Sequence, residues 1–131
     1  MEPRTGEAVA DAKRVVVLVS GHGSNLQALL DAGMPVVLVA ADRPDAYGLE
    51  RARRAGVDTA VVRPADHPDR PAFDLALREL VAGARPDVVC LAGFMRILDP
   101  AFVRAFPERI VNTHPSLLPA FRGAHAVRDA L

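Results

Sequence analysis

Five short runs of aliphatic residues, separated by segments with helical spacing, constrain the fold of this 131-residue chain most strongly. The runs are Arg14–Val19, Val36–Ala40, Thr59–Val62, Asp87–Leu91 and Arg109–Val111. A strand as apolar as VVVLV at positions 15–19 is typical of a parallel sheet, because helices cover both of its faces. The pattern therefore predicts an α/β fold with a doubly wound, mostly parallel sheet.

The segments between the runs carry helix signals. Between the third and fourth runs, apolar residues recur at helical spacing, and Gly83 and Pro86 end that pattern. The apolar residues are Phe73, Ala76, Leu77, Leu80, Val81 and Ala84. An earlier helix is expected to open at Asp45 or Tyr47 and to stop near Gly56. Residues 1–13 lack periodicity and are predicted to be a mobile tail, ahead of one domain over residues 14–131.

Composition narrows the classes of partner. The 16 basic and 16 acidic residues cancel, so neither a nucleic-acid nor a membrane-surface footprint is expected, and small molecules are the predicted partners. A single cysteine, Cys90, allows no internal disulfide and fits the cytoplasm. No stretch is long and apolar enough to cross a bilayer, and no histidine or cysteine spacing predicts a metal site.

The strand order places the chemistry. If the order is 3-2-1-4-5, the first and fourth strands are neighbours, and ligands gather beyond their carboxyl ends where the winding reverses. The segments that follow these two strands, Gly21–Asn25 and Gly93–Leu98, are then expected to face one crevice.

The first of these segments, SGHGSNL at positions 20–26, predicts a phosphate site. Glycines let the backbone approach an anion, and amide groups of the next helix, with the Ser24 hydroxyl, can donate to it. The alternative is a tight turn capped by Ser24 or Asn25. A dinucleotide site is disfavoured: Asp42 lies where a ribose-binding acid would, but Leu26 replaces the third glycine of that motif.

The second segment, GFMRIL at positions 93–98, pairs apolar bulk with one cation. Such a segment can wall a flat heterocycle, with backbone groups of Arg96 and Leu98 bonding its edge and with Met95, Ile97 and Val103 in apolar contact. Ordinary core packing with a solvated Arg96 explains the same pattern.

A third constellation, NTHPSLLP at positions 112–119, leaves the fifth strand. Asn112 offers an amide donor and His114 an imidazole that titrates near neutral pH, and residues i and i+2 of an extended segment point to one side. Both could polarise one reacting carbonyl. Taken alone, the pair is equally explained by structural hydrogen bonds.

With these segments in hand, the chain resembles the phosphoribosylglycinamide formyltransferases. The family's marks are a GxGSNLQA loop, an AGFMRIL segment and an N-x-HPSLLP segment, which stand here at Gly21–Ala28, Ala92–Leu98 and Asn112–Pro119. The similarity runs from about Arg14 to Leu131. It implies a Rossmann-like formyltransferase fold and transfer of a formyl group from 10-formyltetrahydrofolate to the amine of glycinamide ribonucleotide.

The resemblance also implies residue roles. Gly23, Ser24 and Asn25 would hold the ribonucleotide phosphate, and Asn112 and His114 would be catalytic. The folate pocket would be lined by Arg70, Met95, Arg96, Ile97 and Leu98. The implied mechanism is direct acyl transfer without a covalent enzyme intermediate and without a metal.

Two departures from the family pattern qualify these expectations. The family continues beyond the equivalent of Leu131 and carries its catalytic aspartate there, so this stretch alone is expected to be catalytically incomplete. Arg122-Gly123-Ala124 is a run found in the methionyl-tRNA formyltransferases. That enzyme, the formyltetrahydrofolate deformylase and a nonenzymatic nucleotide-binding module therefore stay open as alternatives.

Overall fold

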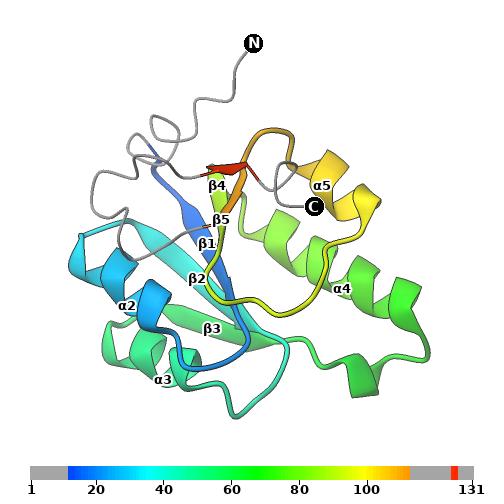
Figure 1. Ribbon diagram of the computed structural model, residues 1–131, viewed down its shortest axis with the longest axis horizontal. Helices are drawn as coiled ribbons and strands as arrows, with labels where there is room; N and C mark the ends of the chain where they lie inside the picture. The colour runs from blue at the N-terminus through cyan, green and yellow to red at the C-terminus, as the bar shows by residue number, and fades with distance from the viewer. Residues whose placement is uncertain (1–11, 113–124, 127–131) are drawn as a thin grey trace.

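The computed structural model describes residues 12–112 and 125–126, which form one six-stranded sheet in the order β3-β2-β1-β4-β5-β6 (Figure 1). The strands are β1 (Val15–Val19), β2 (Val36–Ala41), β3 (Asp58–Val61), β4 (Val88–Leu91), β5 (Ile110–Asn112) and β6 (His125–Ala126). The first five are parallel, and β6 pairs antiparallel with β5. The predicted strands and their 3-2-1-4-5 order are confirmed, whereas β6 was not predicted.

In the described part of the chain, four α-helices and one short 3₁₀ helix connect these strands. They are α2 (Ser24–Asp31), α3 (Tyr47–Arg54), η1 (Pro64–Asp66), α4 (Arg70–Gly83) and α5 (Pro100–Ala105). The α4 helix starts where the Asp69 carboxylate accepts a hydrogen bond from the amide of Ala72 at 2.9 Å. The α5 helix starts in the same way, with Asp99 capping Phe102 at 2.8 Å and Pro100 in the first turn.

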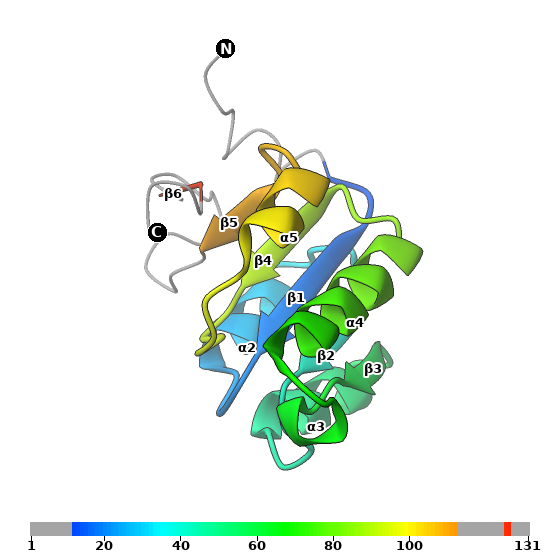
Figure 2. The same cartoon turned by 90° about the vertical axis from the view of Figure 1, so that its right-hand side faces the viewer.

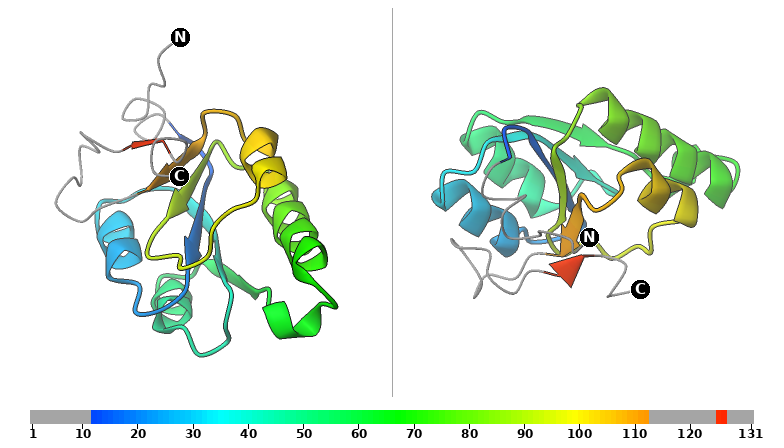
Figure 3. Two further views of the ribbon diagram at one scale, coloured as in Figure 1. Left: turned by 45° about the vertical axis from the view of Figure 1, so that its right-hand side comes forward. Right: turned by 90° about the horizontal axis from the view of Figure 1, so that it is seen from above.

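The helices cover both faces of the sheet, as its apolar strands require (Figures 2 and 3). Val15, Val17 and Val19 of β1 face the apolar cluster beneath α2 and α3. Val16 and Leu18 face the other cluster, which contains Phe73 and Leu77 of α4 and Phe102 of α5. Every residue of β1 is fully buried, because successive side chains of a strand point to opposite faces.

The winding of the sheet reverses between β1 and β4. From β1 the chain first builds β2 and β3 on one side, and then crosses to place β4 and β5 on the other. Leu18 pairs with Leu91, and Leu91 pairs with Asn112. The carboxyl ends of β1, β4 and β5 therefore lie side by side at one edge of the sheet. This edge is where ligands of doubly wound sheets bind.

Within the described part of the chain, none of the helices combines the length and the apolar character that crossing a bilayer would need.

Candidate functional site

A cavity of about 260 Å³ lies at the point where the winding reverses. Its lining comes from the loop after β1, the segment after β4 and the segment after β2: Ser20, Gly21, His22, Gly23, Ser24, Asn25, Arg43, Ala92, Gly93 and Met95. The predicted meeting of residues 21–25 with the start of segment 93–98 in one crevice is confirmed. Among the described residues that line it, Arg43 is the one Lys or Arg, and none is an Asp or Glu.

The loop after β1 enters α2 through a left-handed residue. Gly23 is the N-cap residue with φ +82°, so no side chain caps the helix from that position, and α2 begins at Ser24. Amide hydrogens in the first turn of a helix point along its axis away from the helix, where an anion can accept them. This geometry fits a backbone anion cradle, and both phosphate binding and the alternative of a tight turn capped by Ser24 or Asn25 stay predictions.

The dinucleotide alternative fails on two contacts. Leu26 is fully buried in the apolar cluster between α2 and the sheet, where a dinucleotide site needs a glycine for close helix packing. Asp42 is buried, and its Oδ2 accepts a hydrogen bond from Nε of Arg96 at 2.7 Å. Its carboxylate is thereby directed to an arginine rather than to a ribose.

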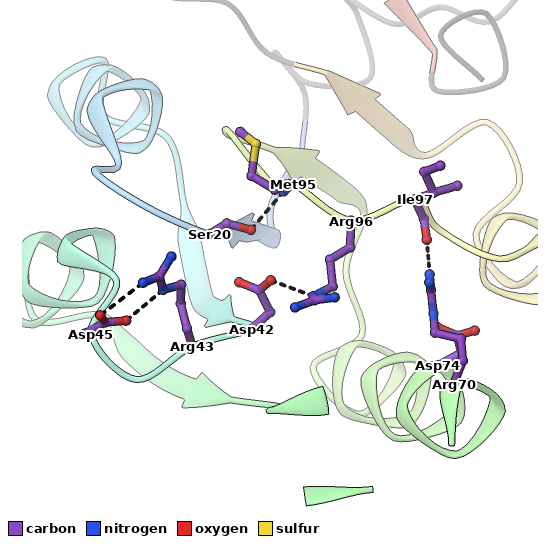
Figure 4. Close-up of polar contacts among 9 residues, drawn as sticks. All are labelled: Ser20, Asp42, Arg43, Asp45, Arg70, Asp74, Met95, Arg96 and Ile97. Carbon is purple, nitrogen blue, oxygen red and sulfur yellow. Dashed lines mark hydrogen bonds and ion pairs between the residues drawn. The ribbon is translucent and has the colours of Figure 1, made fainter. Parts of the chain in front are cut away.

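Three contacts anchor the segment after β4 (Figure 4). The amide of Met95 donates to Oγ of Ser20 at 2.8 Å, which ties the segment to the end of β1. Arg96 bonds Asp42 at the end of β2, and its guanidinium lies 5.6 Å from the ring centre of Phe73. Arg70 of α4 donates to the carbonyl oxygen of Ile97 while its Nε pairs with Asp74 at 2.6 Å.

These anchors leave apolar side chains exposed. Met95 and Ile97 are 77% and 72% exposed, which is unusual for residues so apolar and fits a wall that a ligand covers. Leu98 is buried, and Val103 on α5 packs against the cluster beneath α4. Ordinary core packing thus explains Leu98 and Val103, whereas it does not explain Met95 and Ile97. A folate contact by any of them stays a prediction.

Asn112 is exposed at the end of β5, where it pairs in register with Leu91 of β4. Two strand spacings separate it from Leu18, which is about 10 Å along the sheet edge. The predicted second member of the pair, His114, lies outside the described residues. The structure therefore places Asn112 on the edge that carries the cavity and leaves the pairing a prediction.

Charge at this edge is balanced locally. Arg43 donates to both carboxylate oxygens of Asp45, at 2.7 and 3.1 Å. That hydrogen bonding raises the pKa of Arg43 and lowers the pKa of the Asp45 carboxyl from their ordinary values. Burial alone raises the pKa of the Cys90 thiol to about 12, so this cysteine is a core residue of β4. Among the described residues, no three His, Cys, Asp or Glu side chains are grouped to hold a metal ion.

Sequence reasoning missed the contacts that α3 makes with the cavity loop. The amide of Gly48 donates to the carbonyl of Gly21 at 3.0 Å, and Nε of Arg51 donates to the carbonyl of His22 at 2.9 Å. It also missed Arg43 as a lining residue. No local pattern signals a contact between residues nearly thirty positions apart, although a glycine in the first turn of a helix is a sign of close packing.

Comparison with known proteins adds to this geometry. The sequence matches the formyl transferase family over residues 13–131. The chain belongs to this family. It is 48% identical over 123 residues to the phosphoribosylglycinamide formyltransferase of Escherichia coli (strain K12), which covers 89% of this chain and 58% of that protein.

Two further relatives agree. The chain is 46% identical over 127 residues to the trifunctional purine biosynthetic protein adenosine-3 of Drosophila melanogaster, covering 91% of this chain and 9% of that protein. Glycinamide ribonucleotide transformylase 1 from Symbiobacterium toebii superimposes with a TM-score of 0.72 at 54% identity, over 89% of this chain and 58% of that one. This formyl transferase chain thus spans a little over half of its single-function relatives and a small part of the trifunctional protein.

Proposed function

We propose that the protein transfers a formyl group from 10-formyltetrahydrofolate to the amine of glycinamide ribonucleotide, a step of purine synthesis. The observation that carries this proposal is the cavity at the β1–β4 reversal, where a glycine-rich loop and an exposed apolar segment face each other. Family membership supplies the formyl chemistry. The relatives named above, together with the loop, favour glycinamide ribonucleotide as the acceptor.

The phosphate of the ribonucleotide would bind at the loop. The positive φ of Gly23 and the start of α2 at Ser24 direct backbone amides toward an anion. Gly23, Ser24 and Asn25 all line the cavity, together with Arg43, whose guanidinium is paired with Asp45. The backbone amides of the loop are therefore the groups that would bind the anion.

The folate would bind against residues 95–98. Met95 and Ile97 present apolar surface, while Arg96 and Arg70 fix the backbone on which these side chains stand. A flat pterin covered by such side chains gains the burial that they lack in the free protein. Covering Met95, which also lines the cavity, brings the donor next to the bound ribonucleotide.

In the reaction, the ribonucleotide amine attacks the formyl carbon and the carbonyl oxygen gains negative charge. Asn112 at the end of β5 would donate its amide hydrogen to that oxygen, and His114 would supply a second donor or move a proton. The tetrahedral adduct then collapses as the bond to N10 of the folate breaks, and N10 takes the proton that the amine gives up. We expect no metal in this chemistry and propose the cytoplasm as its compartment, on the sequence grounds given above.

Three acceptors separate this proposal from the related formyl enzymes. The protein as the organism produces it is supplied with 10-formyltetrahydrofolate and either glycinamide ribonucleotide, methionyl-tRNA or water alone, and products are identified by mass spectrometry. We expect formylated ribonucleotide. Formyl-methionyl-tRNA, or release of formate at the same rate without acceptor, would instead assign the tRNA formyltransferase or the deformylase activity.

A ligand titration tests the nonenzymatic alternative. Thermal unfolding is followed with increasing glycinamide ribonucleotide or NAD, since a ligand that binds the folded state raises its stability. Protection by the ribonucleotide and none by NAD is expected. Protection by NAD that is unchanged in Asn112→Ala would favour a nucleotide-binding module.

A further inference from the structure

The first turns of α3 press against the outside of the cavity loop. The amide of Gly48 donates to the carbonyl of Gly21 at 3.0 Å. A Cβ atom added to Gly23 would lie 2.6 Å from Cα of Gly48, so the two backbones are already in contact. The α3 helix thus supports the loop from the side away from the cavity. Gly48, through which α3 makes this contact, does not itself line the cavity.

Arg51, one turn further along α3, extends this contact. Its Nε donates to the carbonyl of His22 at 2.9 Å, and its Nη1 donates to Oε1 of Gln27 in α2 at 3.3 Å. Its Cδ would lie 3.3 Å from a Cβ placed on Gly23. One side chain therefore touches the loop, the glycine that turns it and the helix that follows.

Neighbouring side chains hold Arg51 in this orientation. Its guanidinium lies 5.0 Å from the ring centre of Tyr47, and the His22 ring stacks on the same Tyr47 ring at 5.5 Å. A guanidinium placed on an aromatic face is attracted by the ring. The Arg51 side chain is also partly buried, so fewer rotamers compete with the one that bonds the loop.

These bonds fix the orientation of two consecutive peptide groups. In a trans peptide the C=O and the following N–H point in opposite directions. The Gly21 and His22 carbonyls are both directed to α3, by Gly48 and by Arg51. The amides of His22 and Gly23 therefore point away from α3, and both residues line the cavity, whereas Gly48 and Arg51 do not.

We propose that Arg51 is a positioning residue for phosphate binding: by holding the His22 carbonyl it aims the loop amides into the cavity. Its positive charge behind the loop also favours an anion in front of it. This inference rests on the proposed function only for the identity of the phosphate compound. The geometric part applies to any phosphate that binds the loop.

Four forms of the protein test the proposal: wild type, Arg51→Met, Arg51→Lys and Arg54→Met. The Arg54→Met form is the matched control, because Arg54 also lies over Tyr47, at 5.6 Å, but pairs with Glu50 and makes no hydrogen bond to the described residues of the loop. Affinities for glycinamide ribonucleotide and for inorganic phosphate are measured by calorimetry. Formyl transfer gives kcat and KM for each substrate, and urea unfolding reports stability.

We expect Arg51→Met to weaken ribonucleotide and phosphate binding about tenfold, a loss typical of one charge-assisted hydrogen bond. The KM for the ribonucleotide should rise in parallel, while kcat and the KM for the folate change less than twofold. Lysine keeps the charge but not the fork of donors, so Arg51→Lys should fall between wild type and Arg51→Met. Arg54→Met should bind as the wild type does.

Two results would overturn the proposal. One is equal phosphate affinity in Arg51→Met and Arg54→Met. The other is a fall in kcat and in folate affinity that tracks lost stability, which a merely structural role would produce. If Arg51 governs binding of inorganic phosphate while glycinamide ribonucleotide does not bind, the proposed function fails and the positioning role stands.

Discussion

Replacing Gly23 by alanine should destabilise the protein through two separable costs. Gly23 has φ +82°, where a residue with a Cβ is strained by about 1–2 kcal/mol. The new Cβ would also lie 2.6 Å from Cα of Gly48, a backbone atom that cannot rotate away. Forcing the loop and α3 apart adds about 1–3 kcal/mol, as overpacking does elsewhere. The expected total is about 2–5 kcal/mol.

Gly33 provides the matched control. Its φ is +77°, close to that of Gly23, but a Cβ there meets nothing within 4 Å. The Gly33→Ala variant should therefore cost only the backbone strain, about 1–2 kcal/mol. A second control, Gly21→Ala, has neither a positive φ nor a close neighbour, and should stay within about 0.5 kcal/mol of the wild type.

The assay is equilibrium unfolding in urea, followed by circular dichroism and extrapolated linearly to water. Gly23→Ala should lose about 1–3 kcal/mol more than Gly33→Ala, and it should also bind phosphate more weakly because the loop has moved. If the two variants lose the same free energy, the close contact between the loop and α3 carries no energetic weight and the reasoning is refuted.

Three further predictions follow from the site and the core. Arg96→Met leaves the buried Asp42 carboxylate without its partner and should cost about 3 kcal/mol in urea unfolding, whereas Asp42→Asn should cost under about 1 kcal/mol; equal losses would count against this pairing. Because burial raises the pKa of Cys90 from 9.0 to about 12, only the unfolded chain loses this proton between those pH values. The free energy of unfolding should therefore fall with rising pH by about 1.4 kcal/mol per unit more than in Cys90→Ala; parallel pH profiles would contradict this. Asn112→Ala in the protein as the organism produces it should lower kcat with the ribonucleotide affinity nearly intact, and a loss of affinity alone would remove its catalytic role.

The sheet was predictable because its signal is local. A run such as Val15–Val19 has no polar position, so it must be buried on both faces wherever it lies. Right-handed crossovers limit the possible strand orders, and the order 3-2-1-4-5 that was considered among them is the one observed. The cavity was predictable for the same reason, since loops after neighbouring parallel strands share one edge of the sheet.

The α5 helix was missed although its start carries a recognisable signal. Asp99 followed by Pro100 is typical of a helix N-terminus, but the six residues of the helix are too few to show periodicity. Exposure was also beyond the sequence: Leu98 and Ile97 are equally apolar, yet one is buried and the other 72% exposed. Which of them faces outward depends on tertiary contacts, namely the three anchors of the segment and the core cluster in which Leu98 packs.

The contacts between distant residues could not be inferred at all. Asp42 and Arg96 are 54 positions apart, and Arg51 and His22 are 29 apart. The neighbouring sequence of each of these residues predicts only a solvated charge or a loop residue. Their pairing depends on how far α3 and the segment after β4 extend beyond the sheet edge, which packing decides.

A crystal structure of the protein with glycinamide ribonucleotide bound would show directly where the phosphate group lies. We predict its oxygens within hydrogen-bond distance of the amides at residues 22–25, with the Arg51 side chain on the far side of the same loop. A phosphate held elsewhere, for instance between the side chains of Arg43 and Arg63 beyond β2 and β3, would contradict the account.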